Sequence, residues 1–459
     1  MEISQKRNFI LNGNMRKVII TLALPVMLNN FIQTIYNLTD TFFVSRLGTT
    51  QIAAIQFVWP IIFFMMSVGG GIAIAATSLI SQYIGADEKE MAKRVAGQIL
   101  LFSAIFSVVV GIIGYAYTPT ILKLMGAKGE LYSEALIFLR IMLAGGPTMF
   151  LMFAYNAIRN GLGDTYSPMR LGAMSVITNV ILDPIFIFSF KWGIAGAAYA
   201  TVLSRGIFGI FAVYTLFSKH QEISLTRKHI KFDKEIMGDL LHLGIPSSLG
   251  QSTEAIGFMV LNAFIISFGE ATLTAFAIGN QINSLILMPS IGIASAITTV
   301  VGQNIGADNI QRAKLAVKTS IKLAIVFLSI AAIPLLVFAG KIIRIFSSDI
   351  SVITQGTEYL TLITLSIPLV AIFQCFVGTF QGSGHTRIAM IMLMARLWIL
   401  RLPVIILLKI YTDFGSSLIW YSMIGSNFVI CIVGYMIYKS GIWEKRVINN
   451  KGPVFMEGI

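Results

Sequence analysis

Three acidic residues lie inside apolar stretches of the sequence, where a charged side chain is costly. They are Asp40, Asp183 and Glu254. A charged group at the centre of a bilayer costs roughly 2.5 to 3.5 kcal/mol on insertion scales, and the rare acids found there are kept chiefly for function. Each of the three therefore needs a partner, which is a proton, a cation or a basic side chain.

Asp40 ends a polar stripe on its predicted helix. Gln33, Tyr36, Asn37 and Asp40 are spaced i, i+3, i+4 and i+7, and residues at this spacing share one helical face. We expect the stripe to face the interior of a helix bundle. There Asp40 would hold a proton or cation, and Gln33, Tyr36 and Asn37 would contact a substrate.

A second oxygen-rich group is predicted around Asp183. Asn179 lies one helical turn before Asp183, and Pro184 follows it directly. Proline has no amide hydrogen, so it leaves the carbonyl of residue 180 without its usual helical hydrogen bond. That carbonyl, the amide, the carboxylate and the hydroxyl of Thr201 are hard oxygen donors suited to a sodium or hydronium ion. A neutral network of hydrogen bonds between helices is the alternative.

Other polar residues in the apolar stretches carry weaker expectations. Gln281 is a candidate substrate-binding residue, or a hydrogen-bonding group between helices. Four arginines are candidate partners of the acids, although long basic side chains often reach out to the membrane interface instead. They are Arg140, Arg205, Arg396 and Arg401. No phosphate loop, metal-ligand cluster or catalytic triad spacing is present, so we expect neither an enzyme nor an organic cofactor.

The composition determines the environment of these residues. Of 459 residues, 56% are hydrophobic and 12% are charged, and the mean hydropathy is +0.80, whereas soluble domains have about 25% charged residues. An ordinary soluble enzyme is therefore excluded, and an all-helical polytopic membrane protein is predicted. The net charge of +13 is spread over short loops, without the clustered basic and aromatic surface expected of a nucleic-acid-binding protein.

A membrane-spanning helix needs about 20 mainly apolar residues, and twelve stretches meet this requirement. Alternate loops differ in charge, with 22 Lys and Arg on the side of the two termini and seven on the opposite side. Cytoplasmic loops carry the Lys and Arg excess, so both termini are predicted to be cytoplasmic in a multi-pass plasma (inner) membrane protein. The predicted spans are 16–45, 51–82, 92–118, 131–159, 167–190, 193–218, 236–267, 272–303, 313–340, 352–380, 388–411 and 416–439.

The chain contains an internal repeat at an offset of 221 residues. Ile84-Gly85-Ala86-Asp87 recurs as Ile305-Gly306-Ala307-Asp308, and Pro25 recurs as Pro246. Each half holds six spans, an even number, so the halves insert in the same sense. Such parallel repeats are typical of transporters that alternate access between the two sides of a membrane. The predicted domains are an N-lobe over 1–218, a cytoplasmic linker over 219–235, and a C-lobe with a cytoplasmic tail over 236–459.

The two halves differ at their charged positions. The offset pairs Asp40 with Leu261 and Gln33 with Glu254. We therefore expect the first half to bind the coupling ion and Glu254 to act on the charge of the substrate. Pro25, inside the first span, is expected to kink that helix or serve as its hinge.

These residues together resemble the multidrug and toxic compound extrusion (MATE) family. The resemblance covers about 15–440 and rests on Leu24-Pro25 with Gln33 and Asp40, on the repeated Gly-Ala-Asp loops, on Leu182-Asp183-Pro184 and on the segment Trp192 to Ala198. It implies a V-shaped pair of six-helix lobes that export mainly cationic, amphipathic compounds.

The resemblance also implies roles for particular residues. Asp40, Asn179, Asp183 and Thr201 match the N-lobe site for protons or sodium, with Pro25 at the bend of the first span. Glu254 matches the acid of the seventh span in the NorM-like branch of the family. The tenth span has no acid between Ile372 and Gln381, so the N-lobe cation site is favoured over one in the C-lobe.

The predicted function is secondary antiport, in which organic cations or amphipathic drugs leave the cell in exchange for protons or sodium ions. The expected partners are these compounds and membrane lipid, and the expected state is a monomer. A lipid-linked oligosaccharide flippase is the nearest alternative, disfavoured because the central residues are acidic or neutral. A channel or receptor is the other, disfavoured by the parallel repeat.

Overall fold

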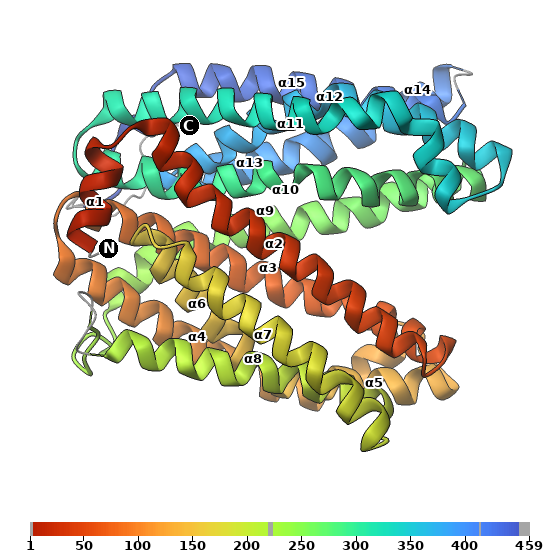
Figure 1. The fold of residues 1–459 in the computed structure, drawn as a ribbon, viewed down its shortest axis with the longest axis horizontal. Coiled ribbons are helices and arrows are strands. Elements are labelled where there is room, and N and C mark those ends of the chain that lie inside the picture. Colours follow the sequence, from red (N-terminus) through yellow and green to blue (C-terminus); the bar gives the residue numbers. More distant parts are fainter. Residues whose placement is uncertain (1–2, 219–223, 413–414, 449–459) are drawn as a thin grey trace. The chain divides into compact units, whose positions relative to one another are not determined.

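The computed structural model describes residues 3–218, 224–412 and 415–448, and every regular element in these ranges is helical (Figure 1). Helices satisfy their own backbone groups, as a chain surrounded by lipid requires. The helices are α1 (Ile3–Asn12), α2 (Met15–Ser45), α3 (Thr49–Gly85), α4 (Lys89–Leu124), α5 (Gly129–Ala144), α6 (Gly146–Gly161), α7 (Tyr166–Pro184), η1 (Ile185–Ser189), α8 (Gly193–Phe217), α9 (Lys234–Ile266), α10 (Glu270–Gly306), α11 (Ile310–Phe346), α12 (Ile350–Gly382), α13 (Thr386–Met394), η2 (Ala395–Arg401), α14 (Leu402–Tyr411), α15 (Ser417–Lys439) and η3 (Ile442–Glu444).

Within the described ranges, eleven helical segments are long and apolar enough to cross a membrane, and the bent pair of α5 and α6 makes a twelfth span when counted as one. The predicted polytopic helical fold with twelve spans is therefore confirmed. Most predicted limits lie within three residues of the helix ends. The exceptions are the ends of α4 and α11, which continue six residues beyond the predictions, to Leu124 and Phe346.

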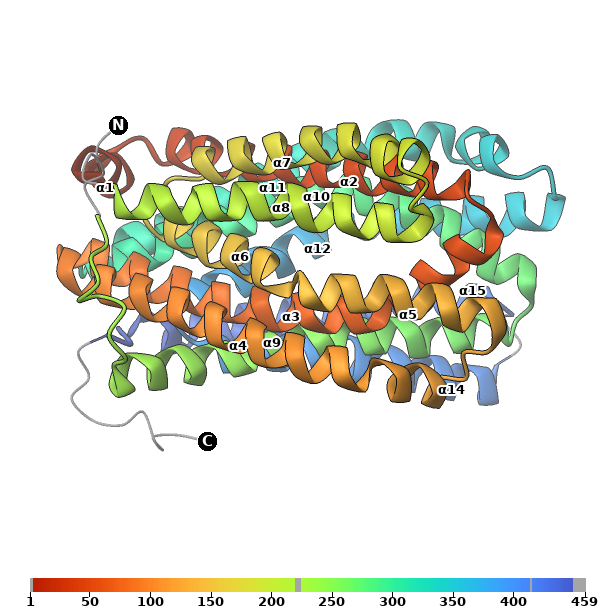
Figure 2. The ribbon, with the colours of Figure 1, turned by 90° about the horizontal axis from the view of Figure 1, so that it is seen from below.

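The fourth predicted span is bent. The axes of α5 and α6 differ by 46° across Gly145 (Figure 2). Gly145 and Gly146 are followed by Pro147, and glycine pairs and prolines are common causes of helix kinks. The equivalent segment of the second half, Ser366-Ile367-Pro368, lies inside the continuous helix α12. The two glycines, rather than the proline alone, therefore account for the bend.

The repeat is visible in the backbone of both halves. α3 and α10 begin and end at residues that are 221 apart. Asp87 and Asp308, in the turns after these helices, both adopt left-handed backbone with φ of 64° and 56°, which aspartate tolerates better than most residues. The hydroxyls of Thr77 and Thr298 each donate to a carbonyl 80 residues further along the chain, at 3.2 and 3.1 Å. Equivalent sequences thus make equivalent turns and helix contacts.

Two spans contain a π-helical turn. α7 ends at Pro184 and continues as η1, and α13 continues as η2 ahead of Pro403. A proline cannot donate to the carbonyl four residues before it, and wider π turns are frequent where the α-helical ladder is interrupted and where a helix carries a functional site. Both π turns adjoin the candidate functional residues described below.

The contacts divide the chain into two compact units. Unit 1 comprises Met1–Arg7 and Leu28–Ser248, and unit 2 comprises Asn8–Met27 and Leu249–Ile459. The division passes through α2 and through α9, which Figure 1 shows as long helices. The two division points are equivalent under the 221-residue offset. Each also lies close to a proline, Pro25 or Pro246.

This division differs from the domain boundary that the repeat predicts. The repeat separates the halves at 219–235, whereas the contacts place the first part of α2 in unit 2 and the first part of α9 in unit 1. The physical reason is that a long helix can pack its two ends against different helices. The linker residues 219–223 and the tail residues 449–459 lie outside the described ranges.

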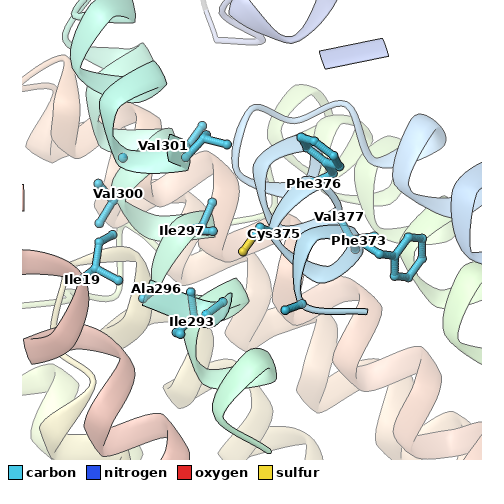
Figure 3. Packing of buried hydrophobic residues seen from close by; sticks show 14 of the residues in the cluster. Ile19, Ile293, Ala296, Ile297, Val300, Val301, Phe373, Cys375, Phe376 and Val377 are labelled. Carbon is cyan, nitrogen blue, oxygen red and sulfur yellow. The ribbon is translucent and has the colours of Figure 1, made fainter. Parts of the chain in front are cut away.

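Each unit has its own packed interior. In unit 2, Ile19 of α2 belongs to the same buried cluster as Ile297 and Val300 of α10 and Phe376 of α12 (Figure 3). The helices approach closely there, because a Cβ atom at Gly378 would lie 2.5 Å from the carbonyl oxygen of Ala294. In lipid, such close packing of small residues replaces the hydrophobic effect as the force that holds helices together.

The interior of unit 1 is built from α3, α5 and α6. Val58 and Met65 of α3 cluster with Leu139 of α5 and Phe150 of α6, and all four side chains are buried. The polar side chains of α7 and α8 described below belong to the same unit.

The amino-terminal helix α1 was not among the predicted elements, because its residues are polar and basic and it is too short to cross a membrane. Its two ends are attached separately. Arg7 donates to the carbonyls of Ile84 and Gly85 at 2.8 Å, at the end of α3 in unit 1. In unit 2, Arg312 donates to the carbonyl of Ile10 at 3.0 Å. These carbonyls lie at helix ends, where helical donors are lacking, and the arginines supply donors to them.

Asp164, in the turn between α6 and α7, also anchors α1. Its carboxylate lies 2.9 Å from Nζ of Lys6 and accepts hydrogen bonds from the backbone and hydroxyl of Ser167 at 3.1 and 2.8 Å. Burial, the largest single influence, raises the pKa of Asp164, but the charge of Lys6 and the hydrogen bonds together outweigh it. The pKa therefore lies below its ordinary value.

Candidate functional site

Two of the four side chains in the predicted polar stripe on α2 face the interior of unit 1. Tyr36 is 8% exposed and Asp40 is half-buried, whereas Gln33 and Asn37 are exposed. Each residue rotates about 100° around a helix, so Tyr36 and Asp40 lie on one side of the stripe and Gln33 and Asn37 on the other. The expectation that the whole stripe faces the interior is therefore wrong for Gln33 and Asn37. Their contact with substrate stays a prediction.

Asn179 and Asp183 of α7 form a buried pair. They are 1% and 0% exposed, and Nδ2 of Asn179 donates to Oδ1 of Asp183 at 3.2 Å. Among the described residues, neither Oδ1 of Asn179 nor Oδ2 of Asp183 has a hydrogen-bond partner. Buried polar atoms are nearly always satisfied, so these two oxygens remain candidate ligands of the predicted proton or cation.

α8 adds a hydroxyl and a positive charge to this group. The hydroxyls of Thr201 and Tyr36 share a hydrogen bond of 2.9 Å. The guanidinium of Arg205 lies 5.5 Å from the centroid of the Tyr36 ring. Asp40 is close enough to Arg205, and Asp183 close enough to Asp40, for their charges to interact. Unit 1 thus brings together all four predicted cation-site residues from three helices.

The donor set fits a proton or a hard monovalent cation. It consists of two carboxylates, one amide oxygen and two hydroxyls. Within the described ranges, no group of three or more His, Cys, Asp or Glu residues gathers, so zinc-type ligation is not available to this site. Carboxylate and carbonyl oxygens are the ligands that hard cations prefer.

Two hollows adjoin these helices. One has a volume of about 20 Å³ and is lined by Thr201, Arg205 and apolar side chains, which is room for roughly one water molecule. The other is an apolar groove of about 820 Å³ along α8, lined by Phe186, Trp192 and Tyr199 among others. Its aromatic and aliphatic lining suits an acyl chain or the apolar body of an amphipathic compound.

Glu254 of α9 is paired within unit 2. Its Oε1 accepts a hydrogen bond from Nη2 of Arg396, which lies on η2. The guanidinium of Arg396 also lies 4.6 Å from the centroid of Phe373, a favourable position for a cation over an aromatic face. The charge of Glu254 is therefore compensated in this structure, and a direct action of Glu254 on substrate charge stays a prediction.

Two of the four intramembrane arginines do not reach the membrane interface. Arg396 and Arg401 are 9% and 5% exposed, so the snorkelling alternative is wrong for both. Arg205 and Arg140 lie over aromatic rings in unit 1, Arg140 at 4.8 Å from the centroid of Tyr115. Arg396 is thus confirmed as a partner of one of the acids. The sequence did not show that this acid is Glu254, because the two residues are 142 apart and no periodicity connects them.

The predicted substrate contact of Gln281 and the predicted hinge at Pro25 both remain predictions. The side chain of Gln281 on α10 is exposed, and its contact with substrate stays a prediction. α2 continues through Pro25 without a break, so a hinge there also stays a prediction. Leu261, the residue equivalent to Asp40, is buried in an apolar cluster of unit 2.

Known proteins similar to this chain match it over most of its length. The sequence pattern of the MatE family matches residues 25–185 and again residues 246–407. Two relatives are the probable multidrug resistance protein YoeA of Bacillus subtilis, 29% identical over 93% of each chain, and the probable multidrug resistance protein NorM of Thermotoga maritima, 28% identical over 96% of this chain and 95% of that one. A solved outward-facing structure of a multidrug resistance MATE family transporter of the MOP superfamily is 29% identical, with a TM-score of 0.89 over 94% of this chain and 96% of that one.

Proposed function

The chain belongs to the MatE family, and on that basis we propose that it exports cationic or amphipathic organic compounds from the cell in exchange for protons or sodium ions. The two relatives named above are called probable multidrug resistance proteins, which supports multidrug efflux. The exchange for ions, the cationic character of the substrate and the absence of an organic cofactor are the proposed part. The proposed setting is the inner membrane, with cytoplasmic termini and a monomeric protein.

One observation carries the proposal of ion coupling. Oδ1 of Asn179 and Oδ2 of Asp183 are buried oxygens without partners among the described residues, beside the hydroxyls of Tyr36 and Thr201. A carboxylate in such a place is stabilised by binding a proton or a cation. The site can therefore change its charge during a transport cycle, which a fully satisfied neutral network would not do.

Coupling requires that the ion and the substrate prefer different conformations. A ligand that binds two conformations equally shifts nothing, whatever its affinity. If the ion-bound cluster favours one conformation of unit 1 and the ion-free cluster another, the inward gradient of that ion drives the substrate outward. Pro25, in the helix that crosses from one compact unit to the other, is the proposed hinge for this change.

The test is dye efflux from vesicles that contain the purified protein. A fluorescent organic cation is loaded, and sodium and proton gradients are imposed separately. We expect one of the two gradients to accelerate efflux at least about tenfold over vesicles without a gradient. Equal efflux with both gradients, with neither and with protein-free vesicles would refute the antiport mechanism.

A further inference from the structure

Unit 2 contains a charged cluster whose net charge is opposite in sign to that of the cluster in unit 1. Unit 1 gathers two carboxylates with one arginine, Arg205. Unit 2 gathers Arg396 and Arg401 with one carboxylate, Glu254, close enough for their charges to interact. With every group ionised, the sum is −1 in unit 1 and +1 in unit 2. The halves have diverged from a shared architecture to opposite polarity.

The π turn η2 brings the two arginines to one side of their helix. Arg396 and Arg401 are five residues apart. In an α-helix, at about 100° per residue, they would point roughly 140° away from each other. In a π-helix the hydrogen bonds run from residue i to residue i+5, so residues five apart lie almost above one another. The unusual turn therefore has the effect of concentrating positive charge.

Among the described residues, the hydrogen-bond partners of Arg401 are neutral groups. Its Nε donates to the hydroxyl of Ser426 and its Nη2 to the amide oxygen of Asn427, both at 3.1 Å. No carboxylate forms an ion pair with Arg401 in the described ranges, since Glu254 is paired with Arg396. A buried charge without a counter-charge is costly, and inside a membrane it usually marks a ligand site.

Two further donors beside this cluster have no acceptor in the part of the chain that the structure describes. They are the buried Nε of Arg396 and Nε2 of Gln251, which lies one helical turn before Glu254. The missing groups at this cluster are therefore acceptors, whereas the unsatisfied atoms of the Asn179–Asp183 pair are oxygens. An oxyanion supplies both the acceptors and the negative charge.

We propose that unit 2 contains a binding site for an oxyanion, carried as a carboxylate or phosphate by an amphipathic organic molecule, with Arg396 as its contact residue. The side chains of Arg396 and Glu254 are 11% and 26% exposed, so a ligand reaches this ion pair from the surface of the unit. Arg401, more deeply buried, contributes its field. The buried Phe373 ring beneath Arg396 points away from α10 (Figure 3) and helps to hold the guanidinium in place.

The test is equilibrium binding in detergent, which needs no ion gradient and is independent of the proposed antiport. The probes are pyrenebutyrate, its methyl ester and a pyrenylbutyl trimethylammonium salt, which share one aromatic body and carry charges of −1, 0 and +1. Affinity is read from energy transfer between tryptophan and pyrene. We expect the native protein to bind the carboxylate at least about tenfold more tightly than the ester, which corresponds to a difference of about 1.4 kcal/mol in binding free energy.

Variants separate a binding role from a structural one. Arg396→Gln should abolish the preference for the carboxylate and strengthen binding of the ammonium probe, because Glu254 loses its partner. Arg396→Lys should keep the preference. The double variant Arg396→Gln with Glu254→Gln should bind all three probes within about threefold of one another. Arg140→Gln, which removes an arginine stacked on an aromatic ring in unit 1, is the matched control and should behave as the native protein.

Two results would overturn the proposal. One is a native protein that binds the carboxylate no better than the ester. The other is a folded Arg396→Gln variant, with an unchanged elution volume and melting temperature, that retains the native preference. Loss of binding for all three probes together in Arg396→Gln would also count against it, because that outcome indicates a structural role for Arg396.

Discussion

The residues of the unit 1 cluster differ in their access to solvent. Asp183 is completely buried, whereas Asp40 is half-buried. The charge of Arg205 acts on the carboxylate of Asp40. Two carboxylates that feel each other's charge are costly to keep ionised together in a low dielectric. Arg205 offsets one of the two charges. One further proton or monovalent cation would neutralise the cluster, and we expect that ion to enter past Asp40, the more exposed of the two carboxylates.

The first prediction concerns Asp40. Asp40→Asn should reduce ion-driven dye efflux at least about a hundredfold while the protein folds and inserts normally, because the amide keeps the shape of the side chain but cannot bind a proton and loses its charge. Efflux from vesicles at equal protein content measures the effect. Glu270→Gln, which neutralises an exposed acid on α10, is the control. Native efflux by a well-folded Asp40→Asn variant would remove Asp40 from the coupling mechanism.

The second prediction is that the cluster binds its ion as one unit. Asn179 and Asp183 share a hydrogen bond, and Asp183 feels the charge of Asp40. Residues that share a ligand show coupling of about 0.5 to 3 kcal/mol in double-mutant cycles. Ion-binding free energies for Asp40→Asn, Asp183→Asn and the double variant, measured by calorimetry, should therefore be non-additive by at least about 1 kcal/mol. Additive losses would instead indicate two independent sites.

The third prediction concerns pH and stability at Asp164. A carboxylate whose pKa is lower in the folded state stabilises the protein above its unfolded-state pKa, near 3.9, and this stabilisation is lost as pH falls through the folded-state value. The pKa of Asp164 is lowered by Lys6 and Ser167 despite its burial. Asp164→Asn should therefore cost about 1 to 3 kcal/mol at neutral pH, with the difference shrinking in acid.

Melting temperatures across a pH series in detergent test this expectation. Asp87→Asn is the matched control, because Asp87 is an exposed turn residue whose left-handed backbone asparagine also tolerates. A difference between Asp164→Asn and the native protein that is independent of pH would contradict the assignment to charge.

The sequence predicts some of these side-chain relations and leaves others open. Helical spacing alone places Asn179 beside Asp183. Spacing does not say which side of the α2 stripe is buried. The stripe covers an arc of the helix surface, and the packing of the neighbouring helices decides which part of that arc is covered. Arg396 and Glu254 are joined by tertiary packing across 142 residues, and spacing along the chain contains no information about such a contact.

At the scale of elements, hydrophobic length predicts the spans but not the interruptions within them. Apolar runs set where helices lie, because backbone polar groups in lipid must be satisfied within the helix. The bend at Gly145 and the π turns η1 and η2 leave some carbonyls without their usual helical donors. Packing against neighbouring helices decides where such an interruption is tolerated. The short helix α1 is likewise held by contacts of Arg7 and Arg312, and its own composition gives little helical signal.

The fourth prediction concerns the proline in α2. Pro25 lies two residues before the point where α2 passes from one compact unit to the other. Pro25→Ala restores a backbone donor for the carbonyl of residue 21 and stiffens the helix. We expect efflux to slow about tenfold, equivalent to about 1.4 kcal/mol in the barrier, while ion affinity changes less than about twofold.

Pro60→Ala in α3 provides the comparison, because Pro60 also lies inside a long helix but far from a division point in sequence. Efflux and calorimetric ion binding are measured on both variants. If the two substitutions slow efflux equally, the effect belongs to any helix proline and the hinge at Pro25 is refuted.

At the scale of the whole molecule, the repeat explains why the halves share helices yet differ in chemistry. Turns and helix contacts such as those of Thr77 and Thr298 are the same in both halves, since they are needed to build each bundle. The charged positions have changed from Asp40 to Leu261 and from Gln33 to Glu254. At these positions each half makes contacts of its own, because Leu261 packs in an apolar cluster of unit 2 and Glu254 pairs with Arg396.

The last prediction is the orientation of the chain in the membrane. Lys and Arg are concentrated on the side of the termini, which predicts that this side is cytoplasmic. Cys375 and Cys431 are buried, so they should not react with a charged thiol reagent from either side. Ser348→Cys, in the turn before α12, and Ser440→Cys, after α15, introduce exposed thiols on opposite sides. A membrane-impermeant maleimide should label Ser348→Cys in intact cells and Ser440→Cys only after permeabilisation. The reverse pattern would overturn the orientation, and with it the direction of export, because the ion gradient that drives transport has a fixed direction across the membrane.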